Sequence, residues 1–401
     1  MSKKLRKLYL VLGPQIYLRS RADLAGTERV FINDLIYLSN KRDYNCRGFA
    51  RTELHLKNLQ SVWYPRSFVN FLRVFDGTPL VRRLFRWEEA AQFCAELFYV
   101  LQIILTSERD AVFLSYSFPL LSLLFPKRSI CFFQAPPKLF FSALFASRYK
   151  KSYYLFCSEH LLLSSKKTYL ALGDAPCTVV PNFVDRSIFK EVIKRKKLRN
   201  TTFLFASAWV KEKGFGLLLD AFLQLKTETL KKVTLIIASA PDLWYSDTTA
   251  NSENYARVQM KKIEQLKKLG VLSLLGGVSQ EKIARQLQNS DWFLFPSVWD
   301  EPFSMSVLEA LSCGTPVIHF GVGGLTEVVD KDNSVLVRKK TSRAFSKLLQ
   351  SISDGRVFRP EPPLWREKNN RMEKLARNSF FSSFLDFFFD TYVEDNPTVD
   401  S

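Results

Sequence analysis

The sequence predicts an α/β protein built from two doubly wound parallel-sheet domains. Three observations lead to this class: the chain has 401 residues, 47% of them are hydrophobic, and short apolar runs alternate with helical stretches along most of its length. A chain of this length suits two domains, and its composition supplies a core for each. Because parallel strands are joined by helical crossovers, the alternation favours parallel sheets.

The N-terminal half is expected to open on a buried strand. Its first apolar run is "KLYLVLG", which Gly13 and Pro14 end. The basic residues before this run resemble the start of a signal peptide, but Arg19 and Arg21 follow too soon for one. A helix is expected just after Gly26, where apolar residues recur at helical spacing, and residues 57–90 show no clear period. Later elements are a long helix at "EEAAQFCAELFYVLQIILTS" and buried strands at "DAVFLSY", "RSICFFQ", "YYLFCS" and "CTVVP".

A charged connection, "EVIKRKKLRN", is the best candidate for the domain boundary. The predicted domains are an N-terminal one at residues 1–195 and a C-terminal one at 196–378. The Phe-rich segment 379–393 is expected to form a helix that packs back on the N-terminal domain. A membrane surface is the alternative cover for its aromatic side chains.

The C-terminal half has a clearer rhythm of strands and helices. Strands are predicted at "TFLFAS", "KVTLIIAS", "VLSLLGG", "DWFLFPS", "PVIHF" and "SVLVR", with helices between them. Right-handed crossovers place the carboxyl ends of such strands at one edge of the sheet, where ligands bind. The residues that follow these strands, and that we expect along this edge, are Lys213, the 276–278 turn, Glu301 and the Gly321–Gly324 turn.

The stretch "DEPFSMSVLEALSCGTP" combines a loop acid with a helix start. Glu301 precedes a proline, which favours extended backbone, and Ser304 is placed to cap a helix that begins at Met305. The N–H groups at a helix start suit phosphate, and carboxylates beside them suit the hydroxyls of a sugar or nucleotide. Glu301 and Glu309 are therefore candidate ligands. An ordinary capped helix with two solvated acids is the alternative.

The net charge of +19 is concentrated in the N-terminal half. Residues 1–195 hold 30 basic and 15 acidic side chains, a net of +15, and the remainder holds 28 and 24, a net of +4. A basic half suits an anionic membrane surface or an acidic acceptor; no nucleic-acid-binding motif occurs, so nucleic acid is not an expected partner. The stretch "WYPRSFVNFLRVF" favours a membrane surface, and a loop packed on its own domain is the alternative.

Cysteine and histidine usage predicts neither disulfides nor a metal site. None of the six cysteines lies in a CxxC pair, which suits reduced core residues of a cytoplasmic protein. The three histidines show no metal-ligand spacing, so no metal and no cofactor are predicted. No run reaches about 18 uninterrupted apolar residues.

Five segments in the same order resemble the retaining glycosyltransferases of family 4, which have the GT-B architecture of two Rossmann-like domains facing across a cleft. The segments are "SEHLLLSSKKTYLALG" with "VVPNFVD", "WVKEKGFGLLLDAF", "LLGGVSQEKIARQLQNSDWFLFPS", "EPFSMSVLEALSCGTPVI" and "GVGGLTEVV". The resemblance is strongest from Ser158 to Val337. In the N-terminal half, "GTERVFINDL" resembles the Gly-rich acceptor-side loop and helix of the family.

The resemblance implies that the C-terminal domain holds a nucleoside diphosphate sugar. The donor-binding residues that it implies are Lys213, Ser304, Met305, Ser306 and Glu309. Glu309 would bind the ribose diol, Lys213 would neutralise the phosphates, and Glu301 would bind hydroxyls of the transferred sugar near the reacting carbon. A saccharide or lipid-linked acceptor would enter from the N-terminal domain. The departing phosphate would take the acceptor's proton on the same face, which retains the configuration.

Four positions depart from the family pattern. Ala208 stands where the family usually has a diphosphate-binding arginine, and Lys211 is a candidate substitute. Losing a bidentate phosphate ligand weakens binding by roughly 1.5–3 kcal/mol unless another cation replaces it. Gln134 stands in the region where the family often has a histidine, and glycines are replaced by Thr27 and Ser304.

Several other functions compete with a metal-independent hexosyltransferase of polysaccharide biosynthesis, placed in the cytoplasm and at the inner face of the membrane. A GT-A enzyme needs a metal-binding Asp-x-Asp, and the one match, Asp330 to Asp332, is expected in a helix-exit turn. A phosphorylase needs a cofactor lysine and usually a longer chain. A sugar-nucleotide epimerase, and a catalytically degenerate GT-B scaffold that binds a polyanion or a membrane surface, remain alternatives.

Overall fold

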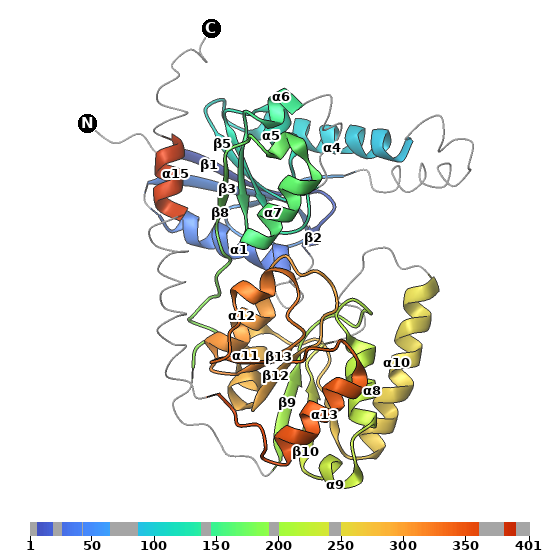
Figure 1. Cartoon of the computed structure of the whole chain (residues 1–401). Helices are drawn as coiled ribbons and strands as arrows, with labels where there is room; N and C mark the ends of the chain where they lie inside the picture. Colours follow the sequence, from blue (N-terminus) through green and yellow to red (C-terminus); the bar gives the residue numbers. More distant parts are fainter. Residues whose placement is uncertain are drawn as a thin grey trace. The chain divides into compact units, whose positions relative to one another are not determined.

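The computed structural model describes residues 6–18, 26–41, 43–64, 87–137, 146–191, 200–239, 250–360 and 381–389. The chain forms two compact units, shown in Figure 1: the first is Met1–Pro181 together with Asn378–Ser401, and the second is Asn182–Arg377. The second unit therefore begins earlier in the chain than the boundary expected after residue 195. The predicted cleft between the domains stays a prediction.

The first unit contains one sheet whose strand pairs are all parallel. Its strands follow the order β2-β3-β1-β5-β6-β7-β8, and β4 pairs with β3. The strands are β1 (Arg6–Leu12), β2 (Tyr17–Leu18), β3 (Tyr44–Thr52), β4 (Leu59–Ser61), β5 (Val112–Tyr116), β6 (Ser129–Phe133), β7 (Tyr153–Phe156) and β8 (Cys177–Val179). Burial of β1 on both faces explains its uninterrupted apolar sequence.

The helices of this unit largely match the predicted ones. They are α1 (Gly26–Ser39), α4 (Trp87–Thr106), α5 (Leu120–Leu124), α6 (Ala146–Tyr149), α7 (Glu159–Thr168), the 3₁₀ turn η2 (Leu170–Leu172) and α15 (Phe381–Phe389). Strand β3 was not predicted, because Arg47, Gly48 and Arg51 interrupt its apolar residues. A Cβ atom on Gly48 would lie 2.7 Å from Cδ2 of Leu35, so the glycine lets α1 approach the strand closely.

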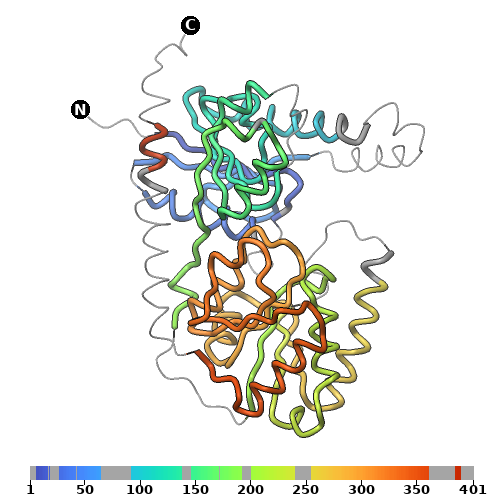
Figure 2. The backbone as a smooth tube through the Cα atoms, in the orientation of Figure 1, coloured from blue at the N-terminus to red at the C-terminus, as the bar shows by residue number. Residues whose placement is uncertain are grey.

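Helix α15 packs on the first unit, although it lies at the far end of the sequence. Asp386 forms an ion pair with Arg6 and accepts a hydrogen bond of 2.9 Å from the Tyr44 hydroxyl. The Phe388 ring meets Tyr153 edge to face at 5.3 Å. In Figure 2 this red segment lies beside the blue N-terminal strands. The rest of the predicted helix 379–393 lies outside the described residues.

The second unit has a parallel sheet in the Rossmann strand order. Taken in chain order its strands are first to sixth, and in space they run third, second, first, fourth, fifth, sixth: β11-β10-β9-β12-β13-β14. The strands are β9 (Thr201–Phe205), β10 (Val233–Ile237), β11 (Leu272–Leu274), β12 (Trp292–Phe295), β13 (Val317–His319) and β14 (Ser334–Leu336). All the strands predicted in this half are present.

Helices cover both faces of this sheet. They are α8 (Phe215–Leu223), α9 (Thr227–Leu230), α10 (Ala250–Lys268), α11 (Gln280–Asn289), α12 (Met305–Ser312), the 3₁₀ turn η4 (Gly323–Glu327) and α13 (Ser342–Ser353). Figure 1 shows α8, α10 and α13 on one side of the strands and α11 and α12 on the other. The crossovers therefore change face between β9 and β12, which makes the carboxyl ends of these two strands the topological switch point.

Candidate functional site

Two loops leave the switch point of the second unit side by side. Strands β9 and β12 are hydrogen-bonded neighbours, with Trp292 opposite Phe203 and Phe293 opposite Leu204. The loop after β9 carries Lys213, and the loop after β12 carries Glu301. Since the two strands are parallel and adjacent, their loops open at the same edge, and these two side chains meet there.

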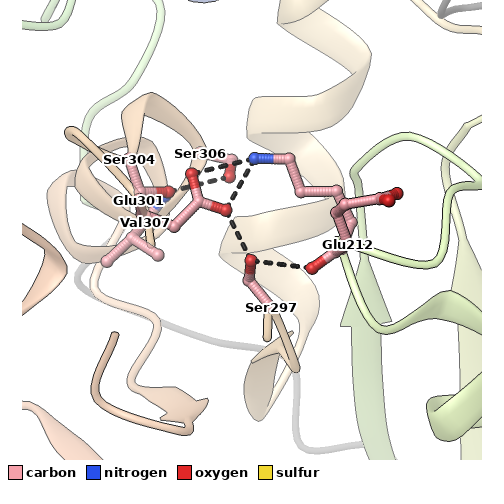
Figure 3. A network of polar contacts seen from close by, with 7 residues as sticks. Glu212, Ser297, Glu301, Ser304, Ser306 and Val307 are labelled. Atoms are coloured by element: carbon pink, nitrogen blue, oxygen red, sulfur yellow. Dashed lines mark hydrogen bonds and ion pairs between the residues drawn. The ribbon is translucent and has the colours of Figure 1, made fainter. Parts of the chain in front are cut away.

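The Lys213 ammonium and the Glu301 carboxylate form a close ion pair. Nζ of Lys213 lies 2.6 Å from Oε1 and 2.9 Å from Oε2 of Glu301. The Ser297 hydroxyl donates to the same Oε1 at 2.6 Å. Figure 3 shows this network, with Ser297 between Glu301 and the main chain of Glu212. Hydrogen bonds of this length to a carboxylate are charge-assisted, so they hold its orientation firmly.

The ion pair is largely removed from solvent. The side chain of Lys213 is 12% exposed and that of Glu301 is 3% exposed. The ammonium also lies over two aromatic rings, 5.1 Å from the centroid of Trp299 and 5.9 Å from that of Phe295. Cation–π attraction and low exposure both favour a charged lysine in a water-poor site.

Two glycines allow the loops to approach the pair closely. Gly214 has φ +68°, and a Cβ atom there would lie 1.9 Å from the carbonyl oxygen of Pro296. Gly323 has φ +56°, and its Cβ atom would lie 2.2 Å from the carbonyl oxygen of Glu301. That oxygen accepts a hydrogen bond of 2.7 Å from the Gly324 N–H. The backbone of Glu301 is thus held by the Gly-rich turn after β13.

Helix α12 has the predicted start and stop. The Ser304 hydroxyl accepts from the Val307 N–H at 3.4 Å, the helix begins at Met305, and Gly314 ends it with φ +79°. Ser304, Met305 and Glu309 are buried, and Ser306 is half-buried. The Ser304 and Ser306 hydroxyl oxygens lie 3.4 Å apart (Figure 3). This helix start lies directly after the Glu301 loop, as an anion site beside a carboxylate requires.

The position expected to hold an arginine is closed to a long side chain. Ala208 is buried, and the neighbouring Trp209 stacks on Phe215 at 4.7 Å. The Trp209 indole N–H donates to the Ser239 hydroxyl at 2.9 Å. Lys211, the candidate substitute cation, is exposed on the same loop. This loop thus combines a packed aromatic pair with one lysine in the ion pair and one at the surface.

His319 ties the Gly-rich turn to strand β14. Its Nδ1 accepts a hydrogen bond of 2.9 Å from the Gly321 N–H, so the proton of the neutral ring belongs on Nε2, 3.1 Å from the Ser334 hydroxyl. Burial lowers the pKa of His319 to about 4. The neutral imidazole therefore serves as a structural acceptor beneath the turn that holds Glu301.

The acceptor-side positions of the first unit lie at the carboxyl edge of its own sheet or on its first helix. Thr27 is in the first turn of α1. Gln134 follows β6, and its backbone N–H donates to the Ser117 hydroxyl at 3.1 Å. Ser117 follows β5 and has φ +49°, which is unusual for a residue other than glycine. The roles of Thr27 and Gln134 stay predictions.

The Asp330–Asp332 segment forms a turn between η4 and β14. The Asp332 N–H donates to a carboxylate oxygen of Asp330 at 2.9 Å, and the Asp330 N–H donates to the Asn333 side chain at 2.9 Å. This is the helix-exit turn that was predicted. Among the described residues, no group of three or more His, Cys, Asp or Glu side chains is arranged to hold a metal ion. None of the helices in these ranges is long and apolar enough to cross a membrane.

Sequence reasoning assigned no role to Ser297 or His319. Ser297 directly follows strand β12 and Pro296, and His319 is the last residue of β13. Both positions are at carboxyl ends of parallel strands, which is the signal that could have identified them. Their side-chain partners come from distant segments, so only the folded chain reveals them.

Comparisons with known proteins concern mainly the second unit. Residues 187–379 match the family model of the glycosyl transferases group 1. A phosphatidylinositol N-acetylglucosaminyltransferase protein from Arabidopsis thaliana is 26% identical over 222 residues, which are 55% of this chain and 45% of that protein. The MMP alpha-(1->4)-mannosyltransferase of Mycolicibacterium hassiacum is 29% identical over 165 residues, 41% of this chain and 36% of that protein. The matched part is thus less than half of these relatives.

Solved structures resemble the whole chain. The structure of Anabaena HepE in complex with UDP has a TM-score of 0.61 and 15% identity, and the match covers 96% of this chain and 100% of that one. Sucrose-phosphate synthase from Thermosynechococcus elongatus has a TM-score of 0.67 at 13% identity, with the same coverage. At these identities the likeness concerns the fold.

Proposed function

This chain has the predicted GT-B fold and its residues 187–379 belong to the glycosyl transferases group 1, and from this premise we propose that the protein is a hexosyltransferase. It moves a hexose-type sugar from a nucleoside diphosphate sugar to a saccharide or lipid-linked acceptor. The observation that carries the proposal is the buried Lys213–Glu301 pair directly before the start of α12, at the switch point of a Rossmann sheet. A cation, a helix start and carboxylates there suit a donor with a diphosphate and two polyols.

In this proposal each predicted residue has one role on the donor. Lys213 and the backbone N–H groups of Ser304, Met305 and Ser306 bind the diphosphate. Glu309 binds the ribose diol. These contacts leave the sugar on the side of Glu301. Since Ala208 supplies no charge, Lys213 and the helix start carry the diphosphate largely by themselves, which predicts modest donor affinity.

Glu301 binds hydroxyls of the transferred sugar and so positions the reacting carbon. The bond between that carbon and the diphosphate oxygen breaks, and the acceptor oxygen bonds to the carbon from the same face. The acceptor's proton passes to the departing phosphate. Retention and independence from metal are parts of this proposal, supported by the family resemblance and by the Asp330–Asp332 turn. Catalysis then rests on positioning and on stabilisation of the leaving-group charge.

A cytoplasmic protein that binds peripherally at an anionic membrane surface completes the proposal. Helix α4 of the first unit exposes three large apolar side chains along one face: Phe98 (46% exposed), Leu101 (47%) and Leu105 (84%). Trp63 is 61% exposed and lies against Phe98, at a ring distance of 5.6 Å. The basic charge of residues 1–195 attracts anionic lipids. The basic stretch after Tyr64 lies outside the described residues.

A panel of nucleotide sugars tests the proposed function. Thermal unfolding is measured with UDP, GDP and ADP and with their sugars, such as UDP-glucose, GDP-mannose and ADP-glucose. The cognate donor should stabilise the chain by about 2.7 kcal/mol when its concentration is 100 times Kd. No stabilisation by any donor, in protein whose circular dichroism shows a folded state, would point instead to a scaffold without donor binding.

A further inference from the structure

Ser297 is a buried hydroxyl with one proton and two acceptors in reach. Its side chain is fully buried directly after strand β12. Its Oγ lies 2.6 Å from Oε1 of Glu301 and 3.1 Å from the carbonyl oxygen of Glu212. A serine hydroxyl donates a single hydrogen, so one of these two contacts must take it.

The Glu212 carbonyl has other donors. It accepts from the Val298 N–H at 2.9 Å and from the Trp299 N–H at 3.3 Å. A carbonyl oxygen has two lone pairs, so these two groups satisfy it. The shorter contact, which is also the one to a charged acceptor, is with Glu301. The proton of Ser297 therefore belongs to Glu301.

The two oxygens of Glu301 differ in what holds them. Oε1 accepts from both Ser297 and Lys213, whereas the contact described for Oε2 is with Lys213, at 2.9 Å. The Gly324 N–H holds the backbone of this residue but not its carboxylate. When a diphosphate draws the Lys213 ammonium toward itself, the Ser297 hydroxyl still orients the carboxylate.

We propose that Ser297 is a positioning residue: it anchors Oε1 of Glu301, so that Oε2 is the oxygen that exchanges Lys213 for a hydroxyl of the transferred sugar. This inference rests on the proposed function and adds a residue to it. Ser297 does not touch the donor. It acts through Glu301, and its effect is confined to the sugar half of the donor.

The test separates the nucleotide from the sugar. Isothermal calorimetry compares a nucleoside diphosphate with its hexose derivative, using whichever of the UDP, GDP and ADP pairs stabilises the wild-type chain most. In Ser297→Ala, affinity for the nucleoside diphosphate should stay within about twofold of wild type, and affinity for the sugar form should fall about tenfold. Ser297→Thr, which keeps the hydroxyl, should restore the sugar-dependent part.

A matched control removes another buried hydroxyl of the same unit. The Ser290 hydroxyl donates to the Gln286 carbonyl at 2.7 Å at the end of α11. Ser290→Ala should leave both affinities unchanged. Folding of Ser297→Ala is not at risk from the Glu212 carbonyl, because its two N–H donors remain.

The outcomes distinguish the two levels of the proposal. If the wild-type chain binds a nucleotide sugar and Ser297→Ala keeps the full contribution of the sugar, or loses affinity for both ligands alike, the inference about Ser297 is wrong and the proposed function stands. If wild type binds no ligand of the panel, the proposed function fails and this inference fails with it. A ligand-free check is the double variant with Glu301→Ala, whose unfolding midpoint should be non-additive with those of the single variants.

Discussion

The Lys213 ammonium contacts both carboxylate oxygens of Glu301, at 2.6 and 2.9 Å, although 88 positions separate the two residues in the sequence. Strands β9 and β12 bring them together because the two strands are adjacent and parallel. Both were expected to bind the donor, one through phosphate and the other through sugar. In the structure without a ligand each partly neutralises the other.

This pair should show strong energetic coupling. Lys213→Met leaves a carboxylate that is 3% exposed without its cation, and should lower the free energy of unfolding by about 3 kcal/mol. Glu301→Gln should cost less, because Trp299 and Phe295 still face the ammonium. Urea unfolding of both single variants and of the double variant gives the coupling energy. Additive losses would mean that the contact contributes nothing to stability.

The two glutamates should fail in different ways. Glu309→Ala removes the proposed ribose ligand and should abolish stabilisation by every nucleotide of the panel. Glu301→Ala should leave stabilisation by the bare nucleoside diphosphate intact and reduce turnover by about 100-fold. Thermal shifts and initial rates measure the two effects. Equal loss of nucleotide binding in both variants would contradict the division of roles.

The Gly-rich turn should not tolerate a side chain at Gly323. At φ +56°, with a Cβ atom 2.2 Å from the Glu301 carbonyl oxygen, alanine must displace either the turn or Glu301. Gly323→Ala should therefore lower the unfolding midpoint and abolish turnover. Gly277→Ala is the matched control, because nothing lies within 4 Å of its Cβ position. Wild-type turnover in Gly323→Ala would show that the close approach is unimportant.

Stability should fall in mild acid because of His319. Burial lowers its pKa from 6.5 to about 4 in the folded chain. Between these values the unfolded chain binds a proton and the folded chain does not, so stability is full above about pH 6.5 and is lost as pH falls toward 4. The loss from this group is at most about 3 kcal/mol.

The matched substitution for this pH dependence is His319→Asn. The asparagine oxygen can accept from the Gly321 N–H in place of Nδ1 but does not titrate. Unfolding free energies measured from pH 7 to pH 4 should fall less steeply in His319→Asn than in wild type. His55→Asn, at an exposed histidine of the first unit, controls for the loss of any histidine. An unchanged slope in His319→Asn would contradict the assignment.

Membrane binding should depend on the exposed face of α4. Co-sedimentation with anionic phosphatidylserine vesicles should occur at low salt and weaken at high salt, because the basic charge is screened. Leu101→Glu with Leu105→Glu should reduce it further. Leu269→Glu is a control at a similarly exposed leucine of the second unit, 54% exposed against 47% for Leu101. No binding at low salt would contradict the membrane proposal.

Much of the fold was predictable because its strands are buried on both faces. The six strands of the second unit stand out as continuous apolar runs between turns, and Ser304 and Gly314 mark the ends of α12 by local chemistry alone. Strand β3 was missed because its glycine serves a neighbour: Gly48 makes room for Leu35 of α1. Such a close approach is a property of two packed elements and leaves no periodic pattern in either.

The sequence by itself determined the alternation of strands and helices, and with it the gathering of Lys213, Glu301 and the Gly321–Gly324 turn at one sheet edge, since right-handed parallel crossovers leave no other arrangement. Tertiary structure decided which of these side chains touch. Hydrogen bonds at 2.6 Å depend on the register of β9 against β12 and on loops packed around Gly214 and Gly323. That packing pairs Lys213 with Glu301 and adds Ser297, because contacts at this range are set by the positions of atoms in three dimensions and not by residue type or spacing.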